Sequence, residues 1–276
     1  MSKLERALEL AKKSREKGAD NLIDRSAKET GEGEVTGLQT LTPNYTRTKV
    51  VNVDKESLSR RGVAVPNFNP SIIEQYNVLR AKLERVLTKN GYKMVLVASP
   101  GDAEGKTLTA INLALSFARE AHRTVLLVDA DMRKPDVTSY LGINAQHGLY
   151  EHLTKGWSLE DLLINPAIPR LTILPAGTPE EPPADLLNGP SMKAFIEDIK
   201  GRYPERIIIF DSPPLLRFSD GIYLADYVDT LLMVTCSGKT KEEDLRRALE
   251  LVEGCPLAGV VLNRARLDYC LSAEYY

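Results

Sequence analysis

In the first half of this chain an apolar stretch leads into a Gly-Lys-Thr triplet and then into a segment with helical spacing. Residues 96–107 read Leu-Val-Ala-Ser-Pro-Gly-Asp-Ala-Glu-Gly-Lys-Thr, and Leu-Thr-Ala-Ile-Asn-Leu-Ala-Leu follows directly. Backbone N–H groups of such a turn, the positive end of the next helix and the lysine together bind nucleotide phosphates. We therefore predict a phosphate-binding loop in which Lys106 bridges the β- and γ-phosphates and Thr107 holds Mg²⁺. The residues expected to contact the nucleotide there are Gly101, Asp102, Ala103, Glu104, Gly105, Lys106, Thr107 and Leu108.

Two further apolar stretches end in carboxylates. Thr124-Val-Leu-Leu-Val leads to Asp129 and Asp131, and Arg206-Ile-Ile-Ile-Phe leads to Asp211. Because ligands of an open parallel sheet lie at the carboxyl ends of its strands, these aspartates and the loop are expected to share one crevice. There one aspartate can hold Mg²⁺ through water and another can accept a proton from an attacking hydroxyl. Each aspartate alone could equally cap a helix or start a turn, but three beside a phosphate loop favour the catalytic interpretation.

Composition excludes several classes of function. The net charge of -2 and the pI near 6.0 argue against bulk attraction to nucleic acid. Three cysteines without metal-ligand spacing argue against a disulfide framework. No apolar run approaches the roughly 18 residues that cross a membrane, and the N-terminus lacks the apolar stretch of a signal peptide. We expect a cytoplasmic protein that does not bind nucleic acid.

The organisation of the chain changes near residue 70. Residues 3–17 have helical spacing and predict a short amphipathic helix, which could dock on a partner or membrane, although solvated or intramolecular packing is favoured. Residues 18–70 lack an apolar period and predict a flexible linker. We therefore divide the chain into an N-terminal extension (1–70), an α/β domain (71–263) and a C-terminal tail (264–276).

From residue 71 onward, short apolar strands alternate with helices. This pattern predicts a doubly wound, mainly parallel sheet covered by helices on both faces. Expected strands lie at 92–98, 123–129, 171–174, 206–211, 230–235 and 258–263, and expected helices at 71–89, 106–120, 148–153, 158–164, 190–200, 219–226 and 240–253.

The order of three motifs resembles that of the bacterial tyrosine kinases. They are Gly105-Lys-Thr, then Leu127-Val-Asp-Ala-Asp-Met-Arg-Lys-Pro, then Ile209-Phe-Asp-Ser-Pro-Pro, in the order of the family's Walker A, Walker A′ and Walker B segments. The resemblance covers roughly residues 70–270. It implies a P-loop NTPase-like fold, ATP and Mg²⁺ as cofactors, and a protein-tyrosine autokinase that regulates exopolysaccharide synthesis and export. The opening Leu4-Glu-Arg-Ala-Leu is similar to that of autokinases from exosortase-linked exopolysaccharide loci.

The resemblance also assigns roles to single residues. It gives Asp129 the proton-accepting role, although on the residues alone either Asp129 or Asp131 could be the base. Asp131 and Asp211 would organise Mg²⁺, and Lys106 would offset charge on the transferred group. Arg133 is expected to position phosphate or the acceptor, or else to form a structural ion pair. Asn263 is expected to contact adenine, with ordinary loop capping as the alternative.

The tail after Asn263 carries three tyrosines, Tyr269, Tyr275 and Tyr276. Its thirteen residues can extend about 43 Å at ~3.3 Å per residue, enough to leave their own domain. The family resemblance implies that these tyrosines are phosphoacceptors for a neighbouring subunit, whereas surface packing is the alternative. It further implies a homo-oligomer, a membrane polysaccharide co-polymerase or chain-length regulator that recruits the protein to the inner face of the membrane, and a cognate tyrosine phosphatase.

Two positions differ from the family pattern. The family's assembly helix carries Glu-x-x-Arg-x-x-Arg, where this chain has Glu74, Asn77 and Arg80. An amide cannot form the bidentate charged pair of a guanidinium, so a weaker or rebuilt ring contact is expected. Ala103 stands where the family commonly has glycine and is expected to restrict the loop backbone.

Two other functions are compatible with the phosphate-binding loop. One is a partitioning-type ATPase, of the kind that segregates plasmids or places the division septum, and the other is a non-catalytic nucleotide-sensing regulator that docks a membrane partner through residues 1–17. Partitioning ATPases usually carry an extra lysine early in the loop, where this chain has Gly101. The motif set therefore favours the kinase.

Overall fold

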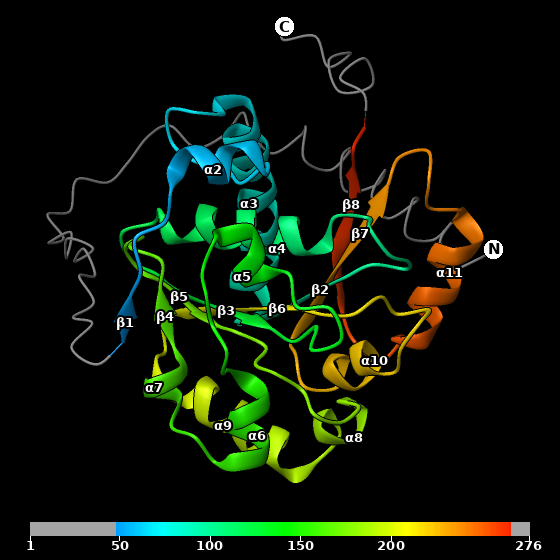
Figure 1. Ribbon diagram of the computed structural model, residues 1–276. Coiled ribbons are helices and arrows are strands. Elements are labelled where there is room, and N and C mark those ends of the chain that lie inside the picture. The colour runs from blue at the N-terminus through cyan, green and yellow to red at the C-terminus, as the bar shows by residue number, and fades with distance from the viewer. Residues whose placement is uncertain (1–47, 266–276) are drawn as a thin grey trace, which may run out of the picture. The chain divides into compact units, whose positions relative to one another are not determined.

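The computed structural model describes residues 48–265, which form an eight-stranded sheet with helices on both faces (Figure 1). The strand order is β1-β4-β5-β3-β6-β2-β7-β8, and within this region only β4 and β5 pair antiparallel. The strands are β1 (Lys49–Val50), β2 (Met94–Ala98), β3 (Thr124–Asp129), β4 (Ile164–Asn165), β5 (Leu171–Leu174), β6 (Arg206–Asp211), β7 (Thr230–Cys236) and β8 (Leu257–Asn263). The predicted doubly wound, mainly parallel α/β fold is confirmed.

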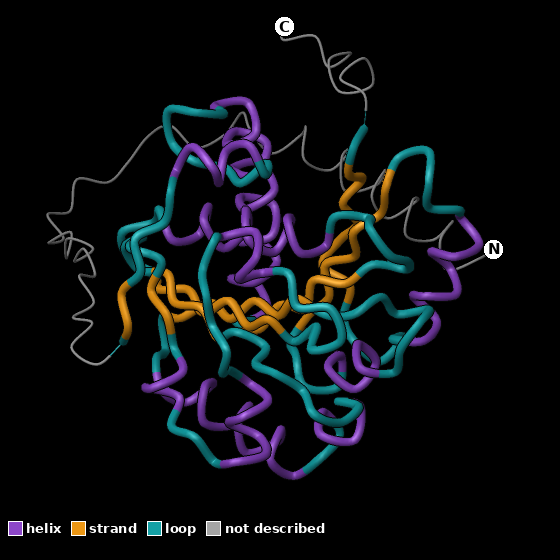
Figure 2. Tube along the Cα trace, in the orientation of Figure 1, coloured by secondary structure: helices purple, strands orange, loops and turns teal. Residues whose placement is uncertain are grey.

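The helices form two layers, one on each side of the strands (Figure 2). They are α2 (Lys55–Arg60), α3 (Pro70–Asn90), α4 (Lys106–Ala118), α5 (Val137–Leu141), α6 (Leu149–Lys155), α7 (Leu159–Leu162), α8 (Ala184–Leu187), α9 (Pro190–Arg202), α10 (Asp220–Ala225) and α11 (Glu242–Leu251). Helices α2 to α5 cover one face, and α6 to α10 cover the other (Figure 1). Between residues 48 and 265, no helix combines the length and the apolar character that crossing a bilayer requires.

The central strands are apolar throughout because both of their faces are covered. All five residues of β2 are buried. Met94 and Leu96 enter the apolar layer beneath α6 to α11, whereas Val95 and Val97 enter the layer beneath α2 to α5. This alternation follows the two-residue period of a strand, so the side chains of each central strand pack against both helical layers.

The structured region begins earlier than the sequence predicts. Residues 48–69 were expected to belong to a flexible linker, yet β1 pairs with β4, and Leu58 and Val63 are buried against α4. The Asn112 side chain holds this segment by accepting the N–H of Ala64 at 2.8 Å and donating to the carbonyl of Gly62 at 3.1 Å. A segment that is held by single side chains has no apolar period in its sequence. The prediction of a flexible linker was therefore wrong for residues 48–69. The predicted helix at 3–17 lies outside the described residues.

Candidate active site

The loop of residues 99–105 joins β2 to α4 at the carboxyl end of the sheet. Gly105 takes a φ of +96°, and a Cβ at this position would collide with Nδ2 of Asn263. The N–H of Gly101 donates to Oε2 of Glu104 at 2.8 Å, so the two ends of the loop are joined by a hydrogen bond to a carboxylate of the loop itself. Ala103 takes a φ of +53°, the left-handed region that glycine tolerates best.

Replacing Gly105 with alanine is expected to reduce the free energy of unfolding by about 2–3 kcal/mol, because the left-handed backbone and the collision with Asn263 both penalise a Cβ. Gly91 is a matched control, since it has a φ of +69° with nothing within 4 Å of the added Cβ. Gly91→Ala should cost only about 1 kcal/mol. Urea denaturation of both variants measures the difference, and equal losses would contradict the predicted collision.

Three acidic residues and one lysine meet at the start of α4. Asp129 and Asp211 are register partners at the ends of β3 and β6. The Lys106 Nζ lies 2.7 Å from Oδ2 of Asp131 and 3.8 Å from Oδ1 of Asp211. It also lies 3.3 Å from the hydroxyl oxygen of Thr107. The structure thus brings together the strand-end carboxylates and the loop lysine that the sequence placed in one crevice.

Burial governs the charge of this cluster. Asp129 and Asp211 are fully buried, and Asp131 is 3% exposed. Burial raises the pKa of Asp211 to about 6, although the charge of Lys106 opposes the rise. Burial, followed by the charge of Asp211, raises the pKa of Asp129 well above its usual range. Burial tends to lower the pKa of Lys106, but the carboxylates of Asp211 and Asp131 outweigh it and raise that pKa. The single ammonium of Lys106 therefore lies among three carboxyl groups, and the cluster favours the binding of an additional cation.

Carboxylate oxygens of Asp129 and Asp211 indicate where a further cation would bind in this cluster. Among the described residues, the Thr107 hydroxyl is the one close hydrogen-bonding group beside the Asp211 carboxylate, and no group donates a hydrogen bond to Oδ1 of Asp129. Oδ2 of Asp129 accepts the N–H of Val137 at 3.1 Å. Buried polar atoms normally have partners, and carboxylate and hydroxyl oxygens are the ligands that Mg²⁺ prefers. Asp211, together with the adjacent Thr107 hydroxyl, therefore fits a magnesium ion.

Arg133 forms an ion pair in this structure. Its Nε lies 3.0 and 3.2 Å from the two carboxylate oxygens of Asp220, a buried residue that begins α10. The Arg133 guanidinium also lies 4.3 Å from the centroid of the Phe218 ring. The structural ion pair, one of the two roles expected for Arg133, is thus present. Sequence reasoning missed Asp220, whose only signal was an acidic residue at a predicted helix start.

Side chains from two loops and from the end of β8 hold the tip of the phosphate-binding loop. The Asn263 side chain donates to the carbonyl of Glu104 at 2.9 Å, and the Thr240 hydroxyl donates to the Glu104 carboxylate. Arg217 forms an ion pair with Asp102. In this structure Asn263 thus forms a hydrogen bond to the loop. Its expected role was either an adenine contact or loop capping. Leu108 packs at the edge of the apolar layer beneath α2 to α5.

The residues expected to mediate assembly lie on α3. Nδ2 of Asn77 donates to Glu74 at 3.3 Å, and its Oδ1 accepts the Ser116 hydroxyl at 3.1 Å. Arg80 forms an ion pair with Glu120, which follows α4. Asn77 and Arg80 therefore contact α4 or its C-terminal end within the same chain.

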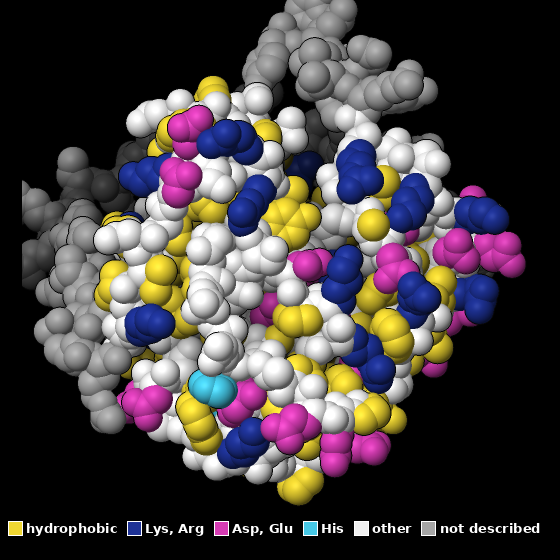
Figure 3. Space-filling model, viewed as in Figure 1, with side chains coloured by type: hydrophobic (Ala, Val, Ile, Leu, Met, Phe, Trp, Pro, Cys, Tyr) yellow, Lys and Arg dark blue, Asp and Glu magenta, His cyan; other side chains and the backbone are white. Residues whose placement is uncertain are grey.

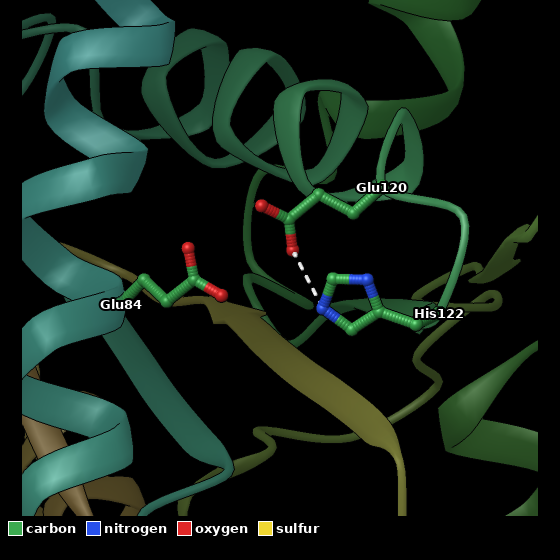
Figure 4. A group of neighbouring side chains, drawn as sticks. All are labelled: Glu84, Glu120 and His122. Carbon is green, nitrogen blue, oxygen red and sulfur yellow. Dashed lines mark ion pairs between the residues drawn. The ribbon is translucent and has the colours of Figure 1, made fainter. Parts of the chain in front are cut away.

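Glu84, Glu120 and His122 form a second polar cluster near the C-terminal end of α4 (Figure 4). His122 Nε2 lies 3.8 Å from Oε2 of Glu120. Arg123 lies 3.3 Å from Glu84 and 3.4 Å from Glu120, and burial raises the pKa of Glu120 while Arg80 opposes the rise. Because two arginines already neutralise these acids, the cluster does not favour a metal ion.

Comparison with known proteins places the chain in a family. Residues 92–239 match the family profile described as an AAA domain. The tyrosine-protein kinase YwqD of Bacillus subtilis (strain 168) is 33% identical over 205 residues, which cover 74% of this chain and 85% of YwqD. The tyrosine-protein kinase ptk of Acinetobacter johnsonii is 27% identical over 215 residues, which cover 77% of this chain but only 29% of ptk. The crystal structure of the VpsO kinase domain superposes with a TM-score of 0.64 at 32% sequence identity, covering 70% of this chain and 96% of that domain. The chain belongs to the bacterial tyrosine-protein kinases.

Proposed function

We propose that this protein transfers the γ-phosphoryl group of ATP to tyrosines in the C-terminal tail of a second copy. The observation that carries the proposal is the buried cluster at the start of α4, in which Lys106 faces Asp129, Asp131 and Asp211. Phosphoryl transfer needs positioned cations and a proton acceptor more than it needs covalent chemistry from the protein. The cluster supplies both kinds of group.

The proposed reaction forms one bond and breaks one. The phenol oxygen of a tail tyrosine attacks the γ-phosphorus, the bond between that phosphorus and the β,γ-bridging oxygen breaks, and ADP leaves. A phenol has a pKa of about 10 and needs a base near neutral pH. Asp129 is our candidate, because its pKa is raised and its Oδ1 has no donor among the described residues.

Lys106 is expected to exchange partners when ATP binds. Its ammonium pairs with Asp131 in this structure, and the same group can instead offset the charge of the β- and γ-phosphates. Asp131 would then be free to help Asp211 and Thr107 hold Mg²⁺, which neutralises phosphate charge when bound.

The cellular role that we propose is the regulation of exopolysaccharide synthesis and export. We propose a homo-oligomer whose contacts involve Glu74, Asn77 and Arg80. Since Asn77 and Arg80 already bond to Ser116 and Glu120, assembly must share or replace these contacts. A membrane chain-length regulator would recruit the protein to the inner face of the membrane, and a tyrosine phosphatase would reverse the modification.

The test is phosphate mapping on the intact chain. Purified protein is incubated with Mg²⁺ and γ-labelled ATP, and the label is located by mass spectrometry. We expect label on Tyr269, Tyr275 or Tyr276, which lie outside the described residues, and its loss when all three are replaced by phenylalanine. Tyr203 is 45% exposed, and Tyr203→Phe is the matched control that should leave labelling unchanged.

Other outcomes would contradict the proposal. Label released only as free phosphate would support a partitioning-type ATPase instead. Tight ATP binding with neither hydrolysis nor phosphotyrosine would support a nucleotide-sensing regulator.

A further inference from the structure

Two cations from different loops contact one exposed residue, Asp102, at the rim of the site. Arg217, in the loop between β6 and α10, forms an ion pair with Asp102 of the phosphate-binding loop. Lys239, in the loop after β7, donates to the backbone oxygen of the same Asp102. Lysine and arginine side chains gather on this face toward α10 and α11 (Figure 3). The Arg217 guanidinium therefore binds a carboxylate at this rim, and in this structure the carboxylate belongs to its own chain.

Breaking the ion pair between Arg217 and Asp102 costs little free energy, so another carboxylate can replace Asp102. The two side chains are 60% and 51% exposed. Ion pairs at such exposure contribute about 0–1 kcal/mol to stability. A guanidinium binds carboxylates through two parallel hydrogen bonds, so an incoming carboxylate could replace Asp102 with good geometry.

Arg217 lies beside the groups that carry the proposed chemistry. The N–H of the preceding residue, Leu216, donates to the carbonyl of Pro100 at 3.2 Å, which fixes the Arg217 loop against the phosphate-binding loop. The next residue, Phe218, has its ring centroid 5.9 Å from the Arg217 guanidinium and 4.3 Å from that of Arg133. Arg133 is two residues beyond Asp131. An acceptor whose hydroxyl reaches the buried acids would therefore pass close to Arg217.

The tail has acidic residues at a matching place in its sequence. Asp268 directly precedes Tyr269, and Glu274 directly precedes Tyr275. We infer that Arg217 is a positioning residue that binds the carboxylate directly before the acceptor tyrosine, so that the kinase selects acidic-residue-then-tyrosine sequences in the tail of a second copy. The inference rests on the proposed function and adds the substrate class that the site accepts.

The experiment separates enzyme from acceptor. The enzyme is the full chain with Tyr269, Tyr275 and Tyr276 replaced by phenylalanine, and the acceptor is the full Lys106→Arg chain, which keeps the buried positive charge. We expect Arg217→Glu in the enzyme to raise the KM for the acceptor at least tenfold, a larger change than in kcat or in the affinity for ATP. An acceptor carrying Asp268→Lys and Glu274→Lys should be poor for the original enzyme and should recover at least tenfold with the Arg217→Glu enzyme.

The matched control is Arg247→Glu, the same charge change at an exposed arginine of α11, which should leave the KM unchanged. An unchanged KM in Arg217→Glu, or a raised KM that the charge-reversed acceptor does not restore, would overturn the inference. So would a loss of ATP affinity in Arg217→Glu as large as the rise in the KM for the acceptor, because the guanidinium would then serve mainly the nucleotide. If the original enzyme labels both acceptors equally, only the inference fails. If it labels neither, the proposed function itself fails.

Discussion

Replacing Lys106 with methionine is expected to lower tail phosphorylation by about a thousandfold or more, a typical effect of removing a cation that stabilises a phosphoryl-transfer transition state. The Lys106 ammonium is the one cation within 4 Å of both Asp131 and Asp211 among the described residues. Without it, the buried carboxylates would repel both one another and the phosphates of ATP. Transfer of label to a kinase-inactive acceptor measures the effect.

Because Lys106→Met leaves buried acids without their counter-charge, the variant is also expected to lose stability, and a folding control is required. Lys106→Arg provides it. This variant keeps the positive charge but presents a planar group in place of a compact ammonium. It should retain the circular dichroism spectrum of the original protein and still lose at least about a hundredfold in activity. Substantial tail labelling by either variant would contradict the role given to Lys106.

Replacing Asp211 with asparagine is expected to stabilise the nucleotide-free protein at pH 8 while abolishing its Mg²⁺-dependent activity. Burial raises the pKa of Asp211 to about 6 from its ordinary value of 3.8. The folded state thus binds a proton more tightly than the unfolded chain does. Above pH 6 the ionised group destabilises the fold by about 3 kcal/mol, and stability is regained as the pH falls from about 6 toward about 4. Asparagine, which is neutral, should remove this cost.

Urea denaturation in EDTA at pH 8 and at pH 4.5 tests this prediction. The gain from Asp211→Asn should be largest at pH 8 and should shrink at the lower pH. Asp185→Asn is a control at an exposed position of α8 and should have little effect at either pH. A loss of stability in Asp211→Asn at pH 8 would show that its attraction to Lys106 outweighs the cost of burial.

The sequence predicted the central sheet well because buried parallel strands are uninterrupted apolar runs. The limits of β5 and β6 agree with the predicted strands at 171–174 and 206–211. Two-residue strands carry no such pattern, so β1 and β4 were not predicted. Helix α2 was also missed, because it lies in a segment held by isolated contacts such as those of Asn112.

In the candidate active site, too, some contacts could be predicted from the sequence and others could not. The meeting of Asp129 and Asp211 could be predicted, since topology alone brings the ends of neighbouring strands together, and the two are indeed register partners. The ion pairs of Arg133 with Asp220 and of Arg217 with Asp102 depend on how loops turn after each strand. No sequence period encodes those turns. The raised pKa of Asp211 depends likewise on burial and neighbours that only the assembled fold defines.

A crystal structure of the full chain with Mg²⁺ and a non-hydrolysable ATP analogue would show whether the nucleotide and the metal bind at the start of α4. We expect the triphosphate along the N–H groups of residues 101–107, with the Lys106 ammonium moved from Asp131 to the γ-phosphate. We also expect Mg²⁺ between the Thr107 hydroxyl and Asp211. An analogue bound elsewhere, with the 2.7 Å pair between Lys106 and Asp131 intact and no metal at Asp211, would contradict both expectations.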